Sequence, residues 1–389
     1  MKLKQPAIIA FLCLFFFISV TRAQNRSVII PGNIKLPQDS VINNLITALN
    51  GFLAQKDKPI KSNTAILKDE FLETSALLDE MMGIEQNDAT KDAAFYKPYL
   101  INLVKQDAGV YAVQLSYIGV ADGSPLLKAT FSLLAKKVDG VFYFYSPLKQ
   151  NTKGWRTKKQ GNITFKFKDE LDVADAKAFQ QNVALIDGRL NANKPILQYY
   201  CDSFLEAQHL LGVDYKADYA GVVNNNLTAN SDEQSLIVNG WSSGQHRFDP
   251  HDLFHDRLRT VMSSEVINRP VDEGCAYLYG GSWGKNWAEV SALFNAYVNE
   301  NPNADWLQLY LDGKNYQNDG GKILKISYMI NALIVQKLEK EKGFGAVMEL
   351  LACGKREPGD ANYFKALEKL TGISKGNFNT EVGKLVHGN

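Results

Sequence analysis

The chain has 389 residues, of which 45% are hydrophobic, and its 43 Lys and Arg against 42 Asp and Glu give a net charge of +1 at pH 7. No basic stripe indicates a nucleic-acid partner, and no charge block indicates a tail or a membrane-surface segment, so these classes are excluded. The length suits two domains, or one large domain with an appendage. We therefore expect an ordinary globular protein, monomeric by default.

The first 23 residues have the character of a signal peptide. A basic start precedes an apolar run at residues 7–20, and Thr21-Arg22-Ala23 places small residues where a signal peptidase cuts. We expect a mature chain that begins near Gln24 and is exported to the periplasm or the extracellular space. It would then have no integral membrane span. The alternative is an uncleaved anchor, which the shortness of the apolar run disfavours.

Residues 24–190 are expected to form an α+β domain of unknown role. Helical spacing of apolar residues predicts helices at 41–55, after Asp39 and Ser40 as caps, and at 71–82. Asp139-Gly140 suits the positive φ angles of a tight hairpin. Alternating apolar residues predict strands at 110–120, 127–135, 141–146 and 162–167. This part of the chain contains no histidine, so we expect a packing domain, with a binding or chaperone-like role as the alternative.

Residues 191–389 are expected to form a mainly helical domain with a small sheet at its start. Strands are predicted at 196–201 and 235–239, and between them a helix that Asp202 caps and that ends at Gly212. Further helices are predicted at 287–298, 323–340, 344–351 and 361–370. The predicted fold class is therefore α+β, with helices and an antiparallel sheet first and a mainly helical domain second.

Two histidines on one helix form the most informative motif. Asp249 is a suitable N-cap and Pro250 fits the first turn, which predicts a helix through Asp249-Pro250-His251-Asp252-Leu253-Phe254-His255. His251 and His255 would lie on one face of this helix, about 6 Å apart at Cβ. Imidazole nitrogens at that spacing can converge on one Zn²⁺ ion, with bonds of about 2.0–2.1 Å.

A third ligand for the ion is expected from Glu273, on a second helix that begins after Asn268-Arg269-Pro270. Gly274 and Ala276 leave room for this helix to pack closely. The sequence therefore predicts a zinc site formed by His251, His255 and Glu273. The alternative is a partly buried helix whose histidines are satisfied by neighbouring side chains.

The stretch from Tyr199 to the C-terminus resembles the peptidase MA-like branch of the gluzincins, the zinc peptidases with a HExxH helix and a downstream glutamate ligand. The likeness covers about half of the chain, and the metal motif is its specific part. Residues 24–190 fit no family. The supporting segments are Leu211-Gly212, Tyr219-Ala220-Gly221, Glu273-Gly274-Cys275-Ala276 and the Ser-Tyr-Met-Ile-Asn-Ala run at 327–332.

The resemblance implies a secreted peptidase that hydrolyses peptide bonds of a peptide or protein substrate through a zinc-bound water. Asp252 would be the general base, and Tyr328 would donate a hydrogen bond to the oxyanion. Asp252 departs from the family, which has glutamate at this position. Its side chain is one methylene shorter, and misplacing a catalytic group by about 1 Å can cost about a hundredfold in rate. The alternative is therefore an inactive gluzincin-like protein that binds zinc or peptide without turnover.

Other candidate residues have a functional and a structural interpretation. His246 lies near the motif and could touch substrate or metal, although a loop histidine is more often only solvated. Trp241, Trp283 and Trp287 could line a peptide cleft or pack in the core. Cys275 is expected to be a small packing residue rather than a nucleophile. The sparse cysteines leave room for one disulfide at most.

Overall fold

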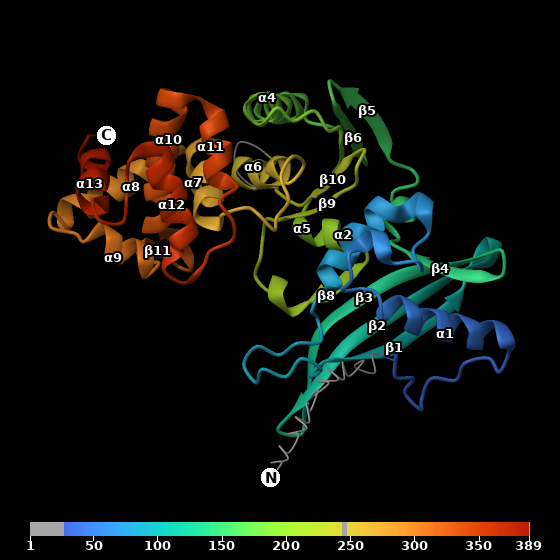
Figure 1. The fold of residues 1–389 in the computed structure, drawn as a ribbon. Coiled ribbons are helices and arrows are strands. Elements are labelled where there is room, and N and C mark those ends of the chain that lie inside the picture. Colours follow the sequence, from blue (N-terminus) through green and yellow to red (C-terminus); the bar gives the residue numbers. More distant parts are fainter. Residues whose placement is uncertain (1–26, 243–246, 389) are drawn as a thin grey trace, which may run out of the picture.

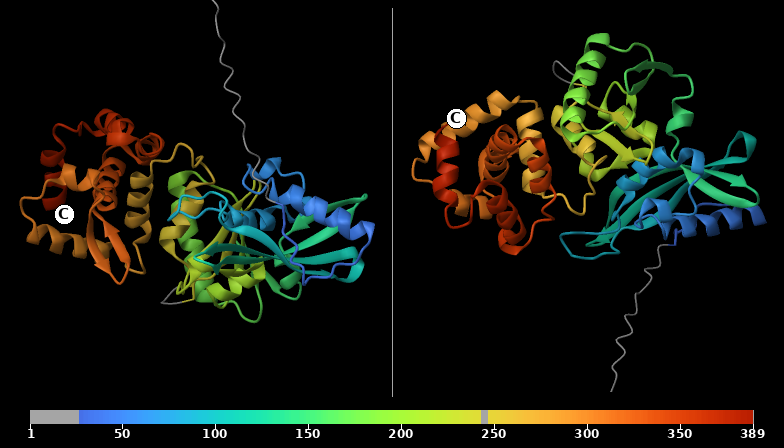
Figure 2. Two further views of the ribbon diagram at one scale, coloured as in Figure 1. Left: turned by 90° about the horizontal axis from the view of Figure 1, so that it is seen from below. Right: turned by 45° about the horizontal axis from the view of Figure 1, so that its top comes forward.

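The computed structural model describes residues 27–242 and 247–388, and it has the α+β fold class that the sequence predicts. Figures 1 and 2 show a helical region on one side of the molecule and an antiparallel sheet with its covering helices on the other. A second sheet adjoins both. The predicted signal peptide, residues 1–23, and His246 lie outside the described residues.

The first sheet has the order β1-β2-β3-β4 and is antiparallel throughout. The predicted hairpin is confirmed, because Asp139 and Gly140 have φ angles of 49° and 87°. Strand β1 was not predicted, and β8, from the second half of the chain, pairs with β3. The strands are β1 (Lys97–Lys105), β2 (Val110–Ala121), β3 (Ser124–Val138), β4 (Val141–Tyr145) and β8 (Val213–Lys216).

The two predicted helices of this part of the chain are α1 (Ser40–Leu53), which packs on the first sheet at β4, and α2 (Phe71–Met81), which contacts β4 and also residues 226–239 of the second sheet. The Asp39 carboxylate accepts a hydrogen bond from the Ile42 N–H at 2.8 Å, which confirms Asp39 as the N-cap of α1. Short helical segments lie in the connections: α3 (Leu148–Asn151) and single turns at Ile60–Ser62, Lys68–Glu70, Asp107–Gly109, Ala217–Tyr219 and Pro358–Asp360.

The second sheet joins strands from both sides of the predicted boundary at residue 190. Its order is β5-β6-β7-β10-β9. Strands β6 and β7 are parallel because α4 (Val173–Leu190) crosses between them, and sequence reasoning overlooked this helix. The strands are β5 (Arg156–Gln160), β6 (Ile163–Phe167), β7 (Ile196–Tyr200), β9 (Asn226–Asn230) and β10 (Ser235–Asn239).

The two faces of the second sheet belong to two different hydrophobic cores. Ile196 and Tyr200 of β7 pack into the core of the helical region, which includes α4. Tyr199 lies between these two residues along β7, but its side chain packs into the core under the first sheet together with α5 (Phe204–Leu211). Alternate side chains of a strand point to opposite faces, so one strand serves both cores. Ser203, rather than the expected Asp202, caps α5 by accepting from the Glu206 N–H at 3.1 Å.

The remaining described chain is mainly helical. The predicted helix at 323–340 begins later, because residues 322–325 form a strand, and the predicted last helix is followed by another one. The helices are α6 (Pro250–Leu258), α7 (Arg269–Gly280), α8 (Trp287–Glu300), α9 (Trp306–Leu311), α10 (Ile326–Lys342), α11 (Phe344–Leu351), α12 (Ala361–Thr371) and α13 (Phe378–His387), and the hairpin strands are β11 (Asn315–Asp319) and β12 (Lys322–Lys325).

Helices α7 and α10 approach closely at Gly274. A Cβ atom at this position would lie 2.6 Å from the Cβ of Asn331 and 2.8 Å from the backbone nitrogen of Ala332. The expectation that Gly274 gives a neighbouring helix room to approach is therefore confirmed.

Within residues 27–242 and 247–388, no helix has both the length and the apolar character that a membrane span requires. Cys201, Cys275 and Cys353 are all free thiols in this part of the chain.

Candidate metal centre

Helix α6 places His251 and His255 on one face, as its sequence predicts. The Asp249 carboxylate accepts from the His251 N–H at 2.9 Å and caps the helix, and Pro250 occupies the first turn. The two imidazole Nε2 atoms lie 3.2 Å apart, with ring centroids at 4.9 Å.

A buried ion pair fixes α6 against α4. The Arg257 guanidinium is 1% exposed and bonds both oxygens of Asp187, at 2.6 and 2.8 Å. Its Nη2 also donates to the carbonyl of Lys194 at 2.9 Å. Removal of one partner from such a buried pair costs about 3–5 kcal/mol, so this contact holds the histidine helix in position.

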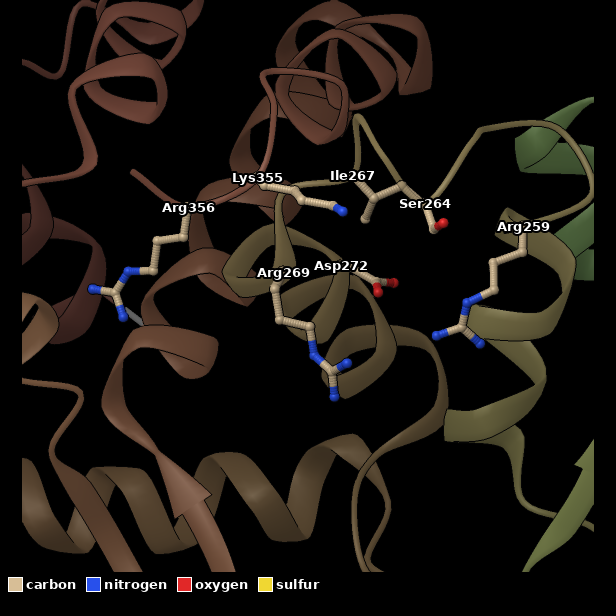
Figure 3. A pocket seen from close by; sticks show the side chains of 7 residues that line it. All are labelled: Arg259, Ser264, Ile267, Arg269, Asp272, Lys355 and Arg356. Carbon is tan, nitrogen blue, oxygen red and sulfur yellow. The ribbon is translucent and has the colours of Figure 1, made fainter. Parts of the chain in front are cut away.

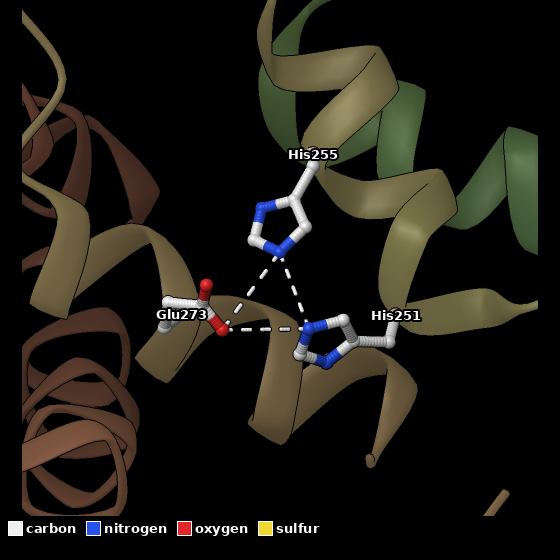
Figure 4. A group of neighbouring side chains, drawn as sticks. All are labelled: His251, His255 and Glu273. Atoms are coloured by element: carbon white, nitrogen blue, oxygen red, sulfur yellow. Dashed lines mark hydrogen bonds and ion pairs between the residues drawn. The ribbon is translucent and has the colours of Figure 1, made fainter. Parts of the chain in front are cut away.

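Helix α7 brings Glu273 to the two histidines (Figure 4). Its Oε2 lies 3.4 Å from the Nε2 of His251 and 4.0 Å from the Nε2 of His255. The three ligand atoms all lie within 4.8 Å of one another. Tetrahedral zinc with bonds of about 2.0–2.1 Å separates its ligand atoms by about 3.3–3.5 Å. The separations of 3.2 and 3.4 Å are close to this value and the third, 4.0 Å, is longer, so these three residues form a possible metal-binding triad.

The outer nitrogens of both imidazoles are occupied by acceptors. His251 Nδ1 lies 2.7 Å from the carbonyl oxygen of Gly281, and His255 Nδ1 lies 2.7 Å from Oδ1 of Asp272. An Nδ1–H that donates to these groups leaves the Nε2 lone pair directed at the centre, which is the tautomer that a metal ion needs. Gly281 has φ +75°, and a Cβ there would overlap the Lys285 carbonyl, so glycine is required at this position.

The charges around the centre favour a cation. Burial lowers the pKa of His251, but the hydrogen bond and charge of Glu273 outweigh it and raise this pKa to about 9. Burial raises the pKa of Glu273, but His251, His255 and Arg269 together hold it at about 2. Arg269 contacts Oε1 of Glu273, which leaves Oε2 for the centre.

The centre opens into a cavity of about 490 Å³. Asp252 lines this cavity and also an adjoining polar cavity of about 260 Å³ that contains all three triad residues. The negative charge of Asp252 contributes to the raised pKa of His251 and, after burial, to a pKa of about 7 at Asp256. Asp252 therefore lines both cavities beside the triad.

Tyr328 of α10 lines the same cavity. Its ring lies edge-on to Tyr277 with centroids 5.7 Å apart, and Tyr277 lies 5.8 Å from the ring of His251. Burial and the nearby Glu273 carboxylate raise the pKa of Tyr328, so its hydroxyl keeps its proton and remains a donor.

The other candidate residues divide into those that line the cavity and those that pack in the core. Trp241 and Trp283 line the cavity, whereas Trp287 packs against the helical core. Cys275 is fully buried, and burial raises the pKa of its thiol well above the usual range, as expected for a packing residue. Sequence reasoning missed the roles of Arg269 and Asp272. Arg269 lies one helical turn before Glu273 and Asp272 lies directly before it, and these positions could have indicated both roles.

Comparison of the chain with protein-family models, with curated proteins and with solved structures gave no match.

Proposed function

We propose that the protein is a zinc-dependent peptidase of the gluzincin kind, with His251, His255 and Glu273 as the metal ligands. The observation that carries the proposal is the convergence of three ligand atoms, at 3.2, 3.4 and 4.0 Å from one another, beside an open cavity. Three protein ligands with one open position are typical of catalytic zinc, whereas structural zinc has four. Bound zinc supplies Lewis acidity that polarises a carbonyl and acidifies a water molecule.

A strand edge without a further strand partner in the described chain supports a peptide as the substrate. Strand β9 is the last strand of its sheet in the described chain, and the N–H of Gly240 donates to the carbonyl of Asn225 at 3.0 Å. Because antiparallel pairing alternates, this register turns the backbone groups of Thr228 away from β10. Asn225, Asn226 and Thr228 line the polar cavity with the triad. An extended peptide can therefore add to this edge next to the metal ligands.

Asp252 and Tyr328 have complementary roles in the proposed reaction. Asp252 takes a proton from the attacking water and delivers it to the leaving amine. Tyr328 donates a hydrogen bond to the carbonyl oxygen as negative charge develops on it. Arg269 holds the second oxygen of Glu273 and so keeps that carboxylate ionised and oriented.

The second candidate is a protein that binds zinc and peptide without turnover. Asp252 itself favours this candidate, since aspartate reaches one methylene less far than the glutamate that gluzincins have there. The triad does not include Asp252, so metal binding would persist without hydrolysis.

One preparation of the protein distinguishes the two candidates. Zinc content would be measured by elemental analysis, and cleavage of a mixed peptide pool by mass spectrometry, with and without a chelator. The peptidase predicts one equivalent of zinc and chelator-sensitive cleavage that Asp252→Ala abolishes. An inert wild type together with an active Asp252→Glu variant would establish the second candidate. Equal cleavage by wild type and Asp252→Ala would exclude Asp252 as the base, and a protein without zinc would exclude both candidates.

A further inference from the structure

A basic pocket of about 250 Å³ adjoins the triad. Arg269 and Asp272 connect the two sites, because Arg269 contacts Glu273 and Asp272 holds His255. Four of the seven lining residues are cationic and one is acidic. Figure 3 shows the lining residues: Arg259, Ser264, Ile267, Arg269, Asp272, Lys355 and Arg356.

The four cations are committed to their partners to different degrees. Arg356 is fully engaged, since its guanidinium bonds both oxygens of the buried Asp360 at 2.8–2.9 Å and is turned away from the pocket in Figure 3. Lys355 pairs with Glu265 at 2.7 Å, but both side chains are more than half exposed, so water competes with this pair. Arg259 has a weaker contact, 3.7 Å from Nη1 to Oδ1 of Asp256.

Arg259 and Arg269 also line the polar cavity that contains the triad. Arg269 further lines the larger cavity, which carries Trp241, Trp283 and Tyr277. Arg259 and Arg269 therefore link the basic pocket to the cavities that the triad lines.

We propose that the basic pocket is a subsite for a carboxylate of the peptide substrate, with Arg259 and Lys355 as its specificity-determining residues. This inference rests on the proposed peptidase function and names the substrate class. The carboxylate belongs to an acidic side chain or to the peptide's C-terminus. Guanidinium groups bind carboxylates through paired charge-assisted hydrogen bonds. Asp272 within the pocket favours a singly charged group over a phosphate dianion.

Binding of defined peptides to the zinc-loaded Asp252→Ala protein, measured by calorimetry, tests the proposal without turnover. The probes are N-acetylated Ala-Phe-Ala-Glu-Ala amide, the same peptide with Gln for Glu, and N-acetylated Ala-Phe-Ala-Gln with a free C-terminus, each also in reversed order. The Glu probe or the free-terminus probe should bind tenfold or more tightly than the neutral Gln amide. Comparison of the Glu and free-terminus probes identifies the source of the carboxylate.

Substitutions of the lining residues test whether the preference for carboxylate probes arises from the basic pocket. Arg259→Gln and Lys355→Gln should each reduce the preference at least threefold, and Arg259→Lys should retain part of it. Lys369→Gln removes an exposed cation of the same helical region, paired only at the surface with Glu349, and should leave the preference intact.

Several outcomes would overturn the proposal: equal binding of carboxylate and neutral probes, no binding of any probe, a preference that survives both substitutions, or inorganic phosphate binding more tightly than every peptide. Zinc analysis of the same samples distinguishes failure of the subsite proposal from failure of the proposed peptidase function. A protein with one equivalent of zinc but no carboxylate preference contradicts the subsite alone. A carboxylate preference without zinc contradicts the peptidase alone.

Discussion

His255 and Asp272 are joined across α6 and α7 by a 2.7 Å hydrogen bond between Nδ1 and Oδ1. Asp272 directly precedes Glu273, so α7 supplies one candidate ligand and also the group that orients another. Both side chains are buried, at 7% and 3% exposure, which protects the bond from competing water. Partners of this kind fix the tautomer and raise the basicity of a ligating imidazole.

Loss of the Asp272 carboxylate should weaken zinc binding without removing the ligands. We expect Asp272→Ala to reduce zinc affinity about 10–100-fold, and Asp272→Asn to reduce it less, since an amide oxygen still accepts from Nδ1–H. Competition with a chromophoric chelator measures both affinities. Glu349→Gln, at an exposed carboxylate of α11, is the matched control. Unchanged affinity in Asp272→Ala would show that His255 is oriented by other groups.

Removal of a ligand should have a larger effect. We expect His255→Ala and Glu273→Gln to lose stoichiometric zinc after dialysis, because two remaining ligands cannot close the site. His209→Ala, on the exposed face of α5, should retain the zinc content of the wild type. Elemental analysis of the folded proteins gives the answer. Equal zinc in wild type and His255→Ala would remove the metal site from consideration.

Zinc affinity should rise with pH across the physiological range. Without metal the pKa of His251 is about 9, so this imidazole carries a proton at pH 7 that zinc must displace. Affinity should therefore increase about tenfold per pH unit below pH 9 and level off above it. The pKa of Glu273, about 2, keeps its carboxylate ionised throughout. Chelator competition at pH 6, 7 and 8 measures the slope, and a flat profile would contradict the His251 assignment.

The tight contact at Gly274 should make this position intolerant of a side chain. Since a Cβ would meet the backbone of α10, we expect Gly274→Ala to destabilise the protein by about 1–3 kcal/mol and to lower its zinc content by displacing Glu273. Thermal unfolding and metal analysis measure the two effects. Gly51→Ala is the control, because it lies in α1 with no atom within 4 Å of the added Cβ. Equal stability of the two variants would contradict the packing argument.

Tyr328→Phe should separate hydrolysis from metal binding. If Tyr328 donates to the developing oxyanion, its loss should lower the cleavage rate about 10²–10³-fold with zinc content unchanged. Tyr297→Phe, on α8 and outside the cavity lining, should cleave as the wild type does. If Tyr328→Phe cleaves at the wild-type rate, the hydroxyl of Tyr328 has no catalytic role and its ring only packs.

Local signals predicted the parts of the fold that depend on neighbouring residues. The Asp249 cap, the Pro250 turn and the four-residue histidine spacing place α6 correctly, and Asp139-Gly140 places the hairpin. Helix α4 was missed although Phe179, Val183, Ile186 and Leu190 repeat at helical spacing and are buried. Its role as a crossover becomes visible only once β6 is paired with β7.

The surroundings of the triad were less accessible from sequence. The approach of Glu273 was expected from its distance along the chain, but the bond of His255 to Asp272 depends on the relative orientation of α6 and α7. The basic pocket joins Arg259 and Arg269 to Lys355 and Arg356, which lie far along the chain. The periodicity or spacing of residues within a single helix or strand does not indicate that these four side chains lie close together.

The shared second sheet has a consequence for how the molecule comes apart. A fragment that begins after residue 190 would lack β5, β6 and α4, and the face of β7 that carries Tyr199 would lose the partners contributed by the first sheet. Excision of the metal-bearing half should therefore yield aggregating material rather than an autonomous module. Calorimetry of the intact chain should give one cooperative transition. Both halves contribute strands to the second sheet, so unfolding of one half would remove strands that the other half needs.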